Sequence, residues 1–418
     1  MDHAARLAGI DIDRTVPALL VKVGRYPIHH GGLGVMRTLG RLGVPVYALS
    51  DRRYTPAVWS RYLAGTLPWS ATGQEDLAEL ALALAEAGRR LGRRAVAIAG
   101  DDEAAVLLAE QAIVLREHFL LPTVPPGLPR RLSSKRGLFE SCQEQGIPTP
   151  RVVFPSSVDD LVARARELTY PVVVKKVDTW SRLLMPDVPT TTIVTDERRL
   201  VARFGDAQVV GGLLLQEYIP QEHAEDWFAH LYADSGSQCL LNIGGRKLRS
   251  WPPAAGWTAF ATAESNPTLQ ALVERLCKET GYQGIGDVDV RHDRRDGQFK
   301  LVDFNPRVGA QFRIAENEAG VDVVRALHLD LTGRPVPQAA PRRRLFLVEN
   351  LDYRARLAYR RRGLRVPAVP RDGTPTVRGW WAADDPRPFV LMAVRTAVGL
   401  VAALPVTLRG RRHRARRG

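Results

Sequence analysis

The sequence predicts an α/β fold that begins with a parallel sheet and continues into lobes with antiparallel strands. In the first 125 residues, apolar strand-like runs alternate with amphipathic helix-like runs, and this alternation is typical of a parallel sheet. Beyond a proline-rich stretch at 122–132, the runs "YQGIGDVDVRHD" and "FKLVDFNPR" flank the turn "RRDGQ". Two strands joined by so short a turn form an antiparallel hairpin, so a second kind of sheet is expected to follow the first.

Length and composition set the frame for this fold. A chain of 418 residues is too long for one ordinary domain. The net charge of +14 is concentrated towards the end, because eight arginines and no acid follow Pro386. Three cysteines without metal or disulfide spacing (Cys142, Cys239 and Cys277) and the lack of a signal-peptide pattern favour a cytoplasmic protein.

Residues 1–125 are predicted to form the parallel α/β domain. The expected strands are 17–24, 44–50 and 93–100, and the expected helices are 31–43, 75–92 and 101–119. The glycines of "HHGGLG" (29–34) lack the G-x-G-x-x-G spacing of a dinucleotide site. Asp101 and Asp102 are interpreted as the start of a helix, where acids are favourable, rather than as a catalytic pair.

Residues 126–340 are predicted to form a second, larger unit. Its expected helices are 133–146, 265–281 and 321–333, and its expected strands, besides the hairpin, are 170–176, 213–219 and 226–234. Ser133 or Ser134 can cap the first of these helices, and Gly146 can end it. The strand 170–176 ends in two lysines, which are notable because the chain has only seven lysines against 52 arginines.

The hairpin carries the strongest chemical pattern. Asp289 lies in its first strand, and Asp303, Asn305 and Arg307 alternate along its second strand, so they share one face. Two carboxylates that face each other repel unless a cation lies between them. Carboxylate and amide oxygens suit Mg²⁺, and a guanidinium suits phosphate or carboxylate. The alternative is an exposed strand face that is polar for solvation alone.

The order of four motifs resembles the ATP-grasp superfamily, and within it the carboxylate–amine ligases such as D-aspartate ligase-like proteins. These motifs are Lys135 at the start of a helix, "PVVVK" ending in Lys175, "QEYI" with Glu217, and the two-acid hairpin. The resemblance covers roughly residues 125–335. It implies a pre-ATP-grasp domain at 1–125, an ATP-grasp domain at 126–340 and a C-terminal extension at 341–418 with an apolar helix and a basic tail. Within the ATP-grasp domain, it implies a lid lobe at about 130–212 and a metal and substrate lobe at about 213–340.

The resemblance also implies a role for each matching residue. The residues implied for ATP are Lys135 and Lys175 at its phosphates, Glu217, Tyr218 and Ile219 at the adenine edge, and Leu215 with Ile219 in an apolar adenine slot. The residues implied for Mg²⁺ or Mn²⁺ are Asp289, Asp303 and Asn305, and Arg307 is implied at the acyl substrate or the transferring phosphate.

Two features depart from the family pattern. The metal-binding acids of the family are commonly Glu, whereas both are the shorter Asp here. Many members also carry a glycine-rich loop after the "PVVVK" strand, but residues 176–192 contain no glycine. Ser181 or Thr191 is the expected substitute for the backbone contacts of that loop.

The segment 244–260, "GGRKLRSWPPAAGWTAF", lies between "QEYI" and the hairpin, where the resemblance implies the acceptor or phosphate side of the site. The resemblance therefore implies that Lys247 or Arg249 binds phosphate or a substrate carboxylate, with Arg249 as a catalytic candidate. Arg313 is a similar, weaker candidate. The alternative is that Arg246, Lys247 and Arg249 form a basic exposed strand.

The C-terminal stretch 387–418 joins a nearly apolar run at 389–408 to six further arginines. Three interpretations stay open: a final helix packed on the body, a helix lying on an anionic membrane, or a spanning helix, which Arg395 and Pro405 disfavour. Nucleic acid is not expected as a partner, because the basic tail lacks interleaved aromatic residues.

These observations predict an ATP- and Mg²⁺-dependent ligase that activates a carboxylate as an acyl phosphate and joins it to an amine. Its expected substrates are small or lipid-linked carboxylates and amines, and its expected location is the cytoplasm or the inner face of the membrane. A homodimer is an open alternative to a monomer. The alternative functions are a non-catalytic ATP-binding regulator or scaffold, and an enzyme of the same fold that performs another phosphoryl transfer.

Overall fold

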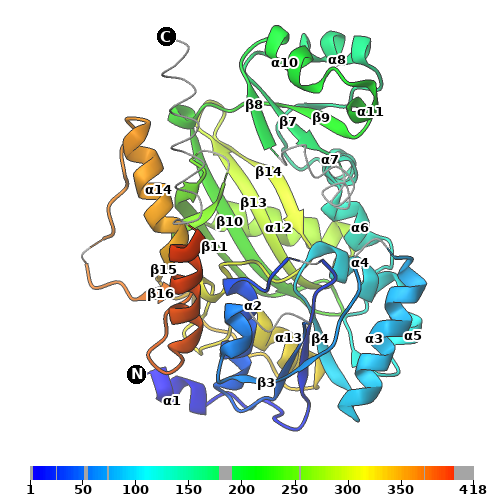
Figure 1. The fold of residues 1–418 in the computed structure, drawn as a ribbon, viewed down its shortest axis with the longest axis vertical. Helices are drawn as coiled ribbons and strands as arrows, with labels where there is room; N and C mark the ends of the chain where they lie inside the picture. The colour runs from blue at the N-terminus through cyan, green and yellow to red at the C-terminus, as the bar shows by residue number, and fades with distance from the viewer. Residues whose placement is uncertain are drawn as a thin grey trace.

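The computed structural model describes residues 3–24, 26–50, 55–72, 75–177, 191–253, 256–370 and 372–399 (Figure 1). Sheets of five, seven and four strands organise these residues. In Figure 1 the five-stranded sheet lies near the bottom, the seven-stranded sheet in the middle and the four-stranded sheet at the top.

The N-terminal sheet is parallel, as the alternation of strands and helices predicted. Its order is β3-β2-β1-β4-β5, and each neighbouring pair is parallel. The strands are β1 Ala18–Val21, β2 Val46–Leu49, β3 Leu63–Leu67, β4 Ala95–Ala99 and β5 Phe119–Leu120. The sequence analysis does not identify β3, which follows the short helix η1 (Pro56–Trp59), because no residue of β3 is fully buried and its apolar pattern is weak.

Helices pack on both faces of this sheet. The helices of this domain are α1 His3–Ala8, α2 His30–Gly40, α3 Leu77–Leu91, α4 Asp102–Glu110 and α5 Ala112–Leu115. Leu20 packs in one core with residues of α2, and Leu19 packs in another with residues of α3, so both strand faces are buried. The predicted helix 101–119 is divided into α4 and α5, because the backbone of Gln111 is not helical.

The central sheet has the order β14-β13-β10-β11-β12-β15-β16. Its strands are β10 Ala224–Ala233, β11 Cys239–Trp251, β12 Trp257–Ala263, β13 Gly284–Asp293, β14 Gln298–Asn305, β15 Leu345–Leu347 and β16 Thr376–Arg378. The predicted hairpin is confirmed as β13 and β14, which pair antiparallel. β15 and β16 come from the region expected to be a separate extension, so residues 341–418 are in part an integral edge of this sheet.

Each face of the central sheet packs on different elements. Helix α12 (Pro267–Thr280) and helices α6 (Leu128–Ser133) and α7 (Lys135–Glu144) share a core with Trp227 and Leu231 of β10. The alternate residues Phe228 and Tyr232 face the other way, towards the N-terminal domain and α13 (Val323–Leu331). Because α6 and α7 belong to the core of the metal and substrate lobe, the predicted start of the lid lobe at about 130 is too early.

The small sheet has the order β6-β9-β7-β8. Its strands are β6 Val152–Val153, β7 Val172–Lys176, β8 Thr191–Val194 and β9 Leu213–Glu217. Helices α8 (Val158–Ala165), α10 (Glu197–Phe204) and α11 (Ala207–Val210) accompany it in the lid lobe. The predicted lobe boundary at 212/213 is therefore wrong, since β9 pairs with both β6 and β7 inside the lid sheet.

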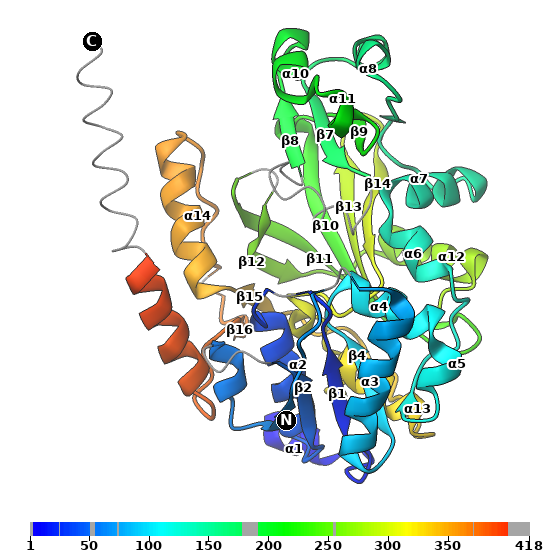
Figure 2. The same ribbon diagram turned by 45° about the vertical axis from the view of Figure 1, so that its right-hand side comes forward.

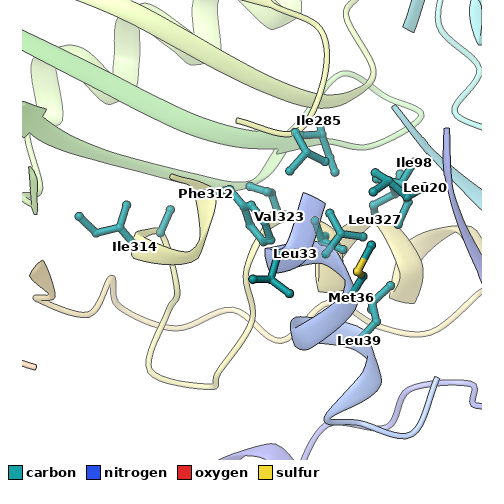
Figure 3. Close-up of a cluster of buried hydrophobic side chains, with 14 of the residues drawn as sticks. Leu20, Leu33, Met36, Leu39, Ile98, Ile285, Phe312, Ile314, Val323 and Leu327 are labelled. Atoms are coloured by element: carbon teal, nitrogen blue, oxygen red, sulfur yellow. The ribbon is translucent and has the colours of Figure 1, made fainter. Parts of the chain in front are cut away.

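One hydrophobic core joins the N-terminal domain to the central sheet (Figure 3). Figure 3 shows Leu20 and Ile98 of the N-terminal sheet close to Ile285 of β13, with the side chains of α2 and α13 between the elements. Phe312 and Ile314 of the short helix η3 (Phe312–Ile314) belong to the same core. The two units are thus packed as one body, and this packing brings the end of β14 against the N-terminal domain.

The C-terminal region lies along one side of the molecule (Figure 2). It consists of β15, α14 (Glu349–Arg361), β16 and a helix over 387–399. Buried Asp385 accepts a hydrogen bond from Arg37 Nε at 2.9 Å and one from Ser60 Oγ at 2.7 Å, which fixes this region to the N-terminal domain. Among the described residues, no helix combines the length and the continuous apolar character that crossing a bilayer requires. Residues 400–418, with the rest of the predicted apolar run and the basic tail, lie outside the described residues.

Candidate active site

A row of acidic and amide side chains lies on one face of the hairpin. Asp287 of β13 is opposite Asn305 of β14, and Asp289 is opposite Asp303. Directly opposite residues share a face, and residues two apart on a strand do so as well. Burial raises the pKa of Asp289, and the nearby carboxylates of Asp287 and Asp303 raise it further. Asp289, Asp303 and Asn305 lie together as predicted, and Asp287 adds a third carboxylate. These four residues are called the acidic row below.

Two lysines from outside the hairpin neutralise part of this charge. Lys247 of β11 places its Nζ atom 2.6 Å from Asp289 Oδ1. Lys135, in the first turn of α7, donates a hydrogen bond to Asp303. Burial alone would raise the pKa of Asp303, but Lys135, Lys175 and Arg307 together lower it. The predicted ATP ligand Lys135 is thus brought to the predicted metal ligands.

Lys175 approaches the same carboxylates from the lid lobe. Side chains along β7 and β9 alternate between the two faces of the lid sheet, and Val174 and Leu215 lie on the face that packs in the lid core. Lys175 lies on the other face and donates a hydrogen bond of 2.9 Å to Gln216 Oε1. Burial lowers its pKa to about 8, against the raising effect of Asp303 and Asp289. The two lobes therefore meet with Lys175 on one side and the acidic row on the other.

A small cavity lies between the lobes, beside Lys135, Leu214, Gln216 and Leu301. The expected adenine-slot residue Leu215 is not among the residues that line it, because Leu215 packs in the lid core. Leu214, one position earlier, faces the cavity instead. A shift of one residue reverses the face of a strand side chain, and the continuous apolar run "LLL" gives no sign of which leucine faces which side.

Residues 217–219, expected at the adenine edge, are connected to the hairpin by hydrogen bonds. Glu217 Oε1 accepts a hydrogen bond of 2.7 Å from Arg295 Nη2 in the hairpin turn. Arg291 of β13 donates to the carbonyl oxygen of Ile219 at 2.7 Å. Tyr218 is half-buried between them. Glu217, Tyr218 and Ile219 therefore lie at the junction of the lobes, and their contact with an adenine ring stays a prediction.

Arg307 joins the acidic row to the N-terminal domain. Its Nη1 atom donates to Asp287 Oδ2 at 2.8 Å, and its Nε atom lies 3.3 Å from Asp102 Oδ1 at the start of α4. Burial lowers the pKa of Arg307, but Asp102 and Asp287 outweigh burial and raise it. Asp101 caps α4 through Ala104 N, as expected for a helix start. Asp102, in contrast, faces the site.

The sequence analysis did not identify Asp287 and Asp102 as site residues. The alternation in "DVDV" (287–290) is a signal for Asp287, because residues two apart on a strand share a face. Asp102 gives no such signal, since its partner Arg307 lies about 200 positions away in the chain.

Arg249 is not brought to the acidic row. Its guanidinium is fully buried, lies 2.7 Å from Asp352 Oδ1 of α14, donates to the carbonyl oxygen of Pro367 and stacks on Phe260. Irregularities in the pairing of β11 with β12 on both sides of Arg249 change the face that it would otherwise share with Lys247. The predicted catalytic contact of Arg249 is therefore replaced by an anchor for α14.

Arg246 and Arg313 are likewise engaged elsewhere. Arg246 Nε donates to Glu264 at 2.7 Å. Arg313 is buried and donates to the carbonyl oxygens of Arg378 and Gly379 at 2.7 and 2.8 Å. Of the basic residues expected in 244–260, Lys247 is the one whose side chain reaches the acidic row.

The donor set fits a hard divalent cation. Asp289 and Asp303 offer two facing carboxylates, and Asn305 donates through Nδ2 to the carbonyl oxygen of Asp287 at 3.1 Å, so its amide oxygen is the atom suited to a cation. Mg²⁺ is usually bound by one or two carboxylates, with phosphate oxygens and waters completing six ligands. Across the described ranges, no set of three or more His, Cys, Asp and Glu side chains is arranged to hold an ion without further ligands. Phosphate oxygens and Asn305 would have to complete this site.

Most of the loop expected to cover the phosphates lies outside the described residues. Ser181 lies in 178–190, outside the described residues. Thr191 is the first residue of β8 and lies opposite Lys175 in the lid sheet. Thr191 is one of the two expected substitutes for the glycine-rich loop. It is paired in the lid sheet with Lys175, which is a predicted phosphate ligand.

Comparisons with known proteins find relatives that match about half of the chain. No protein-family model matches the chain. The chain is 22% identical to the D-aspartate ligase of Enterococcus faecium over 222 residues, which are 51% of this chain and 53% of that protein. It is 29% identical to the D-alanine–D-alanine ligase of Ectopseudomonas mendocina over 194 residues, which are 42% of this chain and 57% of that protein. The chain thus spans about half the length of these curated relatives.

Solved structures extend the likeness over most of the chain. One is the biotin carboxylase domain of Hydrogenobacter thermophilus 2-oxoglutarate carboxylase, a dimer in complex with MgADP and bicarbonate. It superposes with a TM-score of 0.57 and 18% identity, over 79% of this chain and 72% of that one. The chain therefore has the ATP-grasp fold, and its sequence resembles the carboxylate–amine ligases built on that fold.

Proposed function

We propose that this protein is an ATP- and Mg²⁺-dependent ligase that activates a carboxylate as an acyl phosphate and joins it to an amine. The observation that carries the proposal is the meeting of Asp289 and Asp303 with three lysines from α7, β7 and β11. Phosphoryl transfer needs little covalent help from a protein, and it depends on positioning and on neutralising phosphate charge. The resemblance to D-aspartate and D-alanine–D-alanine ligases supports the same reaction class.

The nucleotide is proposed to bind between the lobes. Lys135 of α7 and Lys175 of β7 both lie near Asp303, so both can contact phosphate oxygens bound there. Asp289, Asp303 and Asn305 would hold Mg²⁺, which supplies charge neutralisation at the phosphate oxygens when bound. The MgADP found with the 2-oxoglutarate carboxylase domain supports this choice of cofactor.

The substrate carboxylate is proposed to bind at Arg307. Asp102 and Asp287 hold two of its nitrogens, and no described residue accepts a hydrogen bond from Nη2. A guanidinium fixed in this way can present its remaining N–H groups to a carboxylate or to the oxyanion that forms when the amine attacks. Arg307 therefore serves as the orienting cation of the acyl group.

The substrates are proposed to be small carboxylates and amines, and the alternative is that they are lipid-linked. We also propose a cytoplasmic location and a homodimer, the second supported by the dimer formed by the 2-oxoglutarate carboxylase domain. Contact of residues 387–418 with a membrane would favour a lipid-linked substrate.

A hydroxylamine trap tests the proposed function. The full chain is incubated with ATP, Mg²⁺, hydroxylamine and pools of amino acids and other small carboxylates, and hydroxamate and ADP are measured. Hydroxamate and ADP are expected in equal amounts, and Asp303→Asn is expected to lower both by about 100-fold or more. ATP binding without product from any pool would favour a large or lipid-linked substrate or the non-catalytic alternative, and ADP without hydroxamate would favour another phosphoryl transfer.

A further inference from the structure

The helix over 387–399 has an apolar face that the rest of the described chain leaves exposed. Val390, Val394 and Val398 are 53, 56 and 63% exposed. They are spaced four residues apart and so lie along one side of the helix. Ala393 and Ala397 on the same side are exposed as well, whereas Met392 on the opposite side is buried. Such an apolar helix side open to water usually has a partner.

Helix α14 and the turn after it expose a strongly basic surface. Residues 353–365, "YRARLAYRRRGLR", contain six arginines and no acid. The exposed side combines Tyr353 and Leu357 with arginines at 356, 360, 361, 362 and 365. None of these five guanidinium groups is within ion-pair distance of a carboxylate in the part of the chain that the structure describes. Their charge is therefore available to a partner outside the protein.

The two helices lie on the same side of the molecule, as both Figure 1 and Figure 2 show. Their beginnings are linked, because Trp381 N donates to Glu349 Oε1 at 2.8 Å and the rings of Trp381 and Phe389 are 5.4 Å apart. Trp381 is itself partly exposed at this junction. We define the C-terminal face as the outward side chains of α14, residues 362–365, Trp381 and the helix 387–399.

We propose that the C-terminal face binds the surface of an anionic lipid bilayer. Apolar side chains of a surface helix enter the boundary between headgroups and acyl chains, and arginines bind the anionic headgroups around them. Exposed Trp and Tyr side chains favour the same boundary. This contact includes α14 as well as the helix 387–399, and none of its residues belongs to the proposed active site.

Other partners fit this face less well. A second copy of the chain would bring unpaired arginines against one another, which is repulsive. Nucleic acid would satisfy the arginines, but it would leave Val390, Val394 and Val398 in water. A lipid surface matches the apolar residues and the basic residues together.

Sedimentation of the full chain with vesicles tests this proposal. The protein is expected to sediment with vesicles of phosphatidylcholine and phosphatidylglycerol in equal parts, and to stay in solution with phosphatidylcholine alone. Val394→Glu is expected to abolish binding, because it places a charge in the middle of the inserted side. The double change Arg360→Ala and Arg361→Ala is expected to weaken binding about 30-fold.

The matched controls are on other surfaces of the same chain. Leu82→Glu changes an apolar side chain of α3 that is 65% exposed, and Arg198→Ala changes an exposed arginine of α10. Both are expected to sediment as the unchanged protein does. Equal binding to the two kinds of vesicle, binding to neither, or an unaltered Val394→Glu variant would overturn the proposal. Hydroxamate formation in solution is expected to be the same in all these variants, so failure of the ligase assay leaves the lipid test intact.

Discussion

Lys247 and Asp289 form an ion pair across the central sheet, with 2.6 Å between Nζ and Oδ1. Burial alone would lower the pKa of Lys247, but Asp289, Asp226 and Asp287 raise it, so the ammonium stays charged. The pair joins β11 to β13 with β10 between them. It places a positive charge next to the carboxylates that are proposed to hold Mg²⁺, at the position where phosphate charge would have to be neutralised.

Replacing Lys247 is therefore expected to reduce turnover more than stability. Lys247→Met should lower the rate of hydroxamate formation by about 100- to 1000-fold, because a fixed charge facing the reacting phosphate is lost. Lys247→Arg keeps the charge and should retain more of the rate. The matched control is Lys278→Met on the exposed side of α12. Equal rates for the Lys247→Met and Lys278→Met variants would remove Lys247 from the proposed site.

Lys175 should make ATP use dependent on pH near 8. Burial lowers its pKa to about 8, so the side chain is protonated below that pH and neutral above it. A neutral amine attracts phosphate less, and kcat/KM for ATP reports ionisations of the free enzyme. This value is expected to fall as the pH rises through about 8. Lys175→Arg should remove the fall, because a guanidinium stays charged over this range. A variant with the same fall would assign the ionisation to another group.

The hairpin could be predicted because the sequence features that determine it lie within one short segment of the chain. The turn "RRDGQ" fixes which residues are paired, and alternation fixes which side chains share a face. Asp289, Asp303 and Asn305 therefore lie as expected relative to one another. The lysines could be placed only through the family resemblance, since Lys135 and Lys247 reach the hairpin from α7 and β11.

The parts of the fold and of the site that the sequence did not predict depend on contacts between distant segments, which no local sequence pattern encodes. Arg307 meets Asp102 only because the N-terminal domain packs against the end of β14. Arg249 turns away from Lys247 because the pairing of β11 and β12 is irregular around it. The strands β15 and β16 have three residues each, and they join the central sheet through pairing with β12 rather than through their own apolar pattern.

The structural role of Arg249 predicts a loss of stability. Arg249→Met leaves Asp352 buried without its partner, and breaking a buried pair typically costs about 3–5 kcal/mol. Arg246→Met removes a more exposed pair with Glu264, which is expected to cost at most about 1 kcal/mol. Urea unfolding of the two variants measures the difference. Full stability of Arg249→Met with loss of hydroxamate formation would restore the catalytic interpretation of Arg249.

Gly309 is expected to be needed for the shape of the site. A Cβ atom at this position would lie 2.4 Å from Cε1 of His230 and 2.7 Å from Cγ of Asp287. Both neighbours are buried, so Gly309→Ala should displace Asp287, and with it the Arg307 guanidinium that Asp287 holds. Overpacking of this kind typically costs about 1–3 kcal/mol, and hydroxamate formation should fall further than stability does. The matched control is Gly127→Ala, since a Cβ atom there would meet no atom within 4 Å. If Gly309→Ala turned over as fast as Gly127→Ala, the position of Asp287 and Arg307 would not limit the reaction, and the acyl group would have to be oriented by other residues.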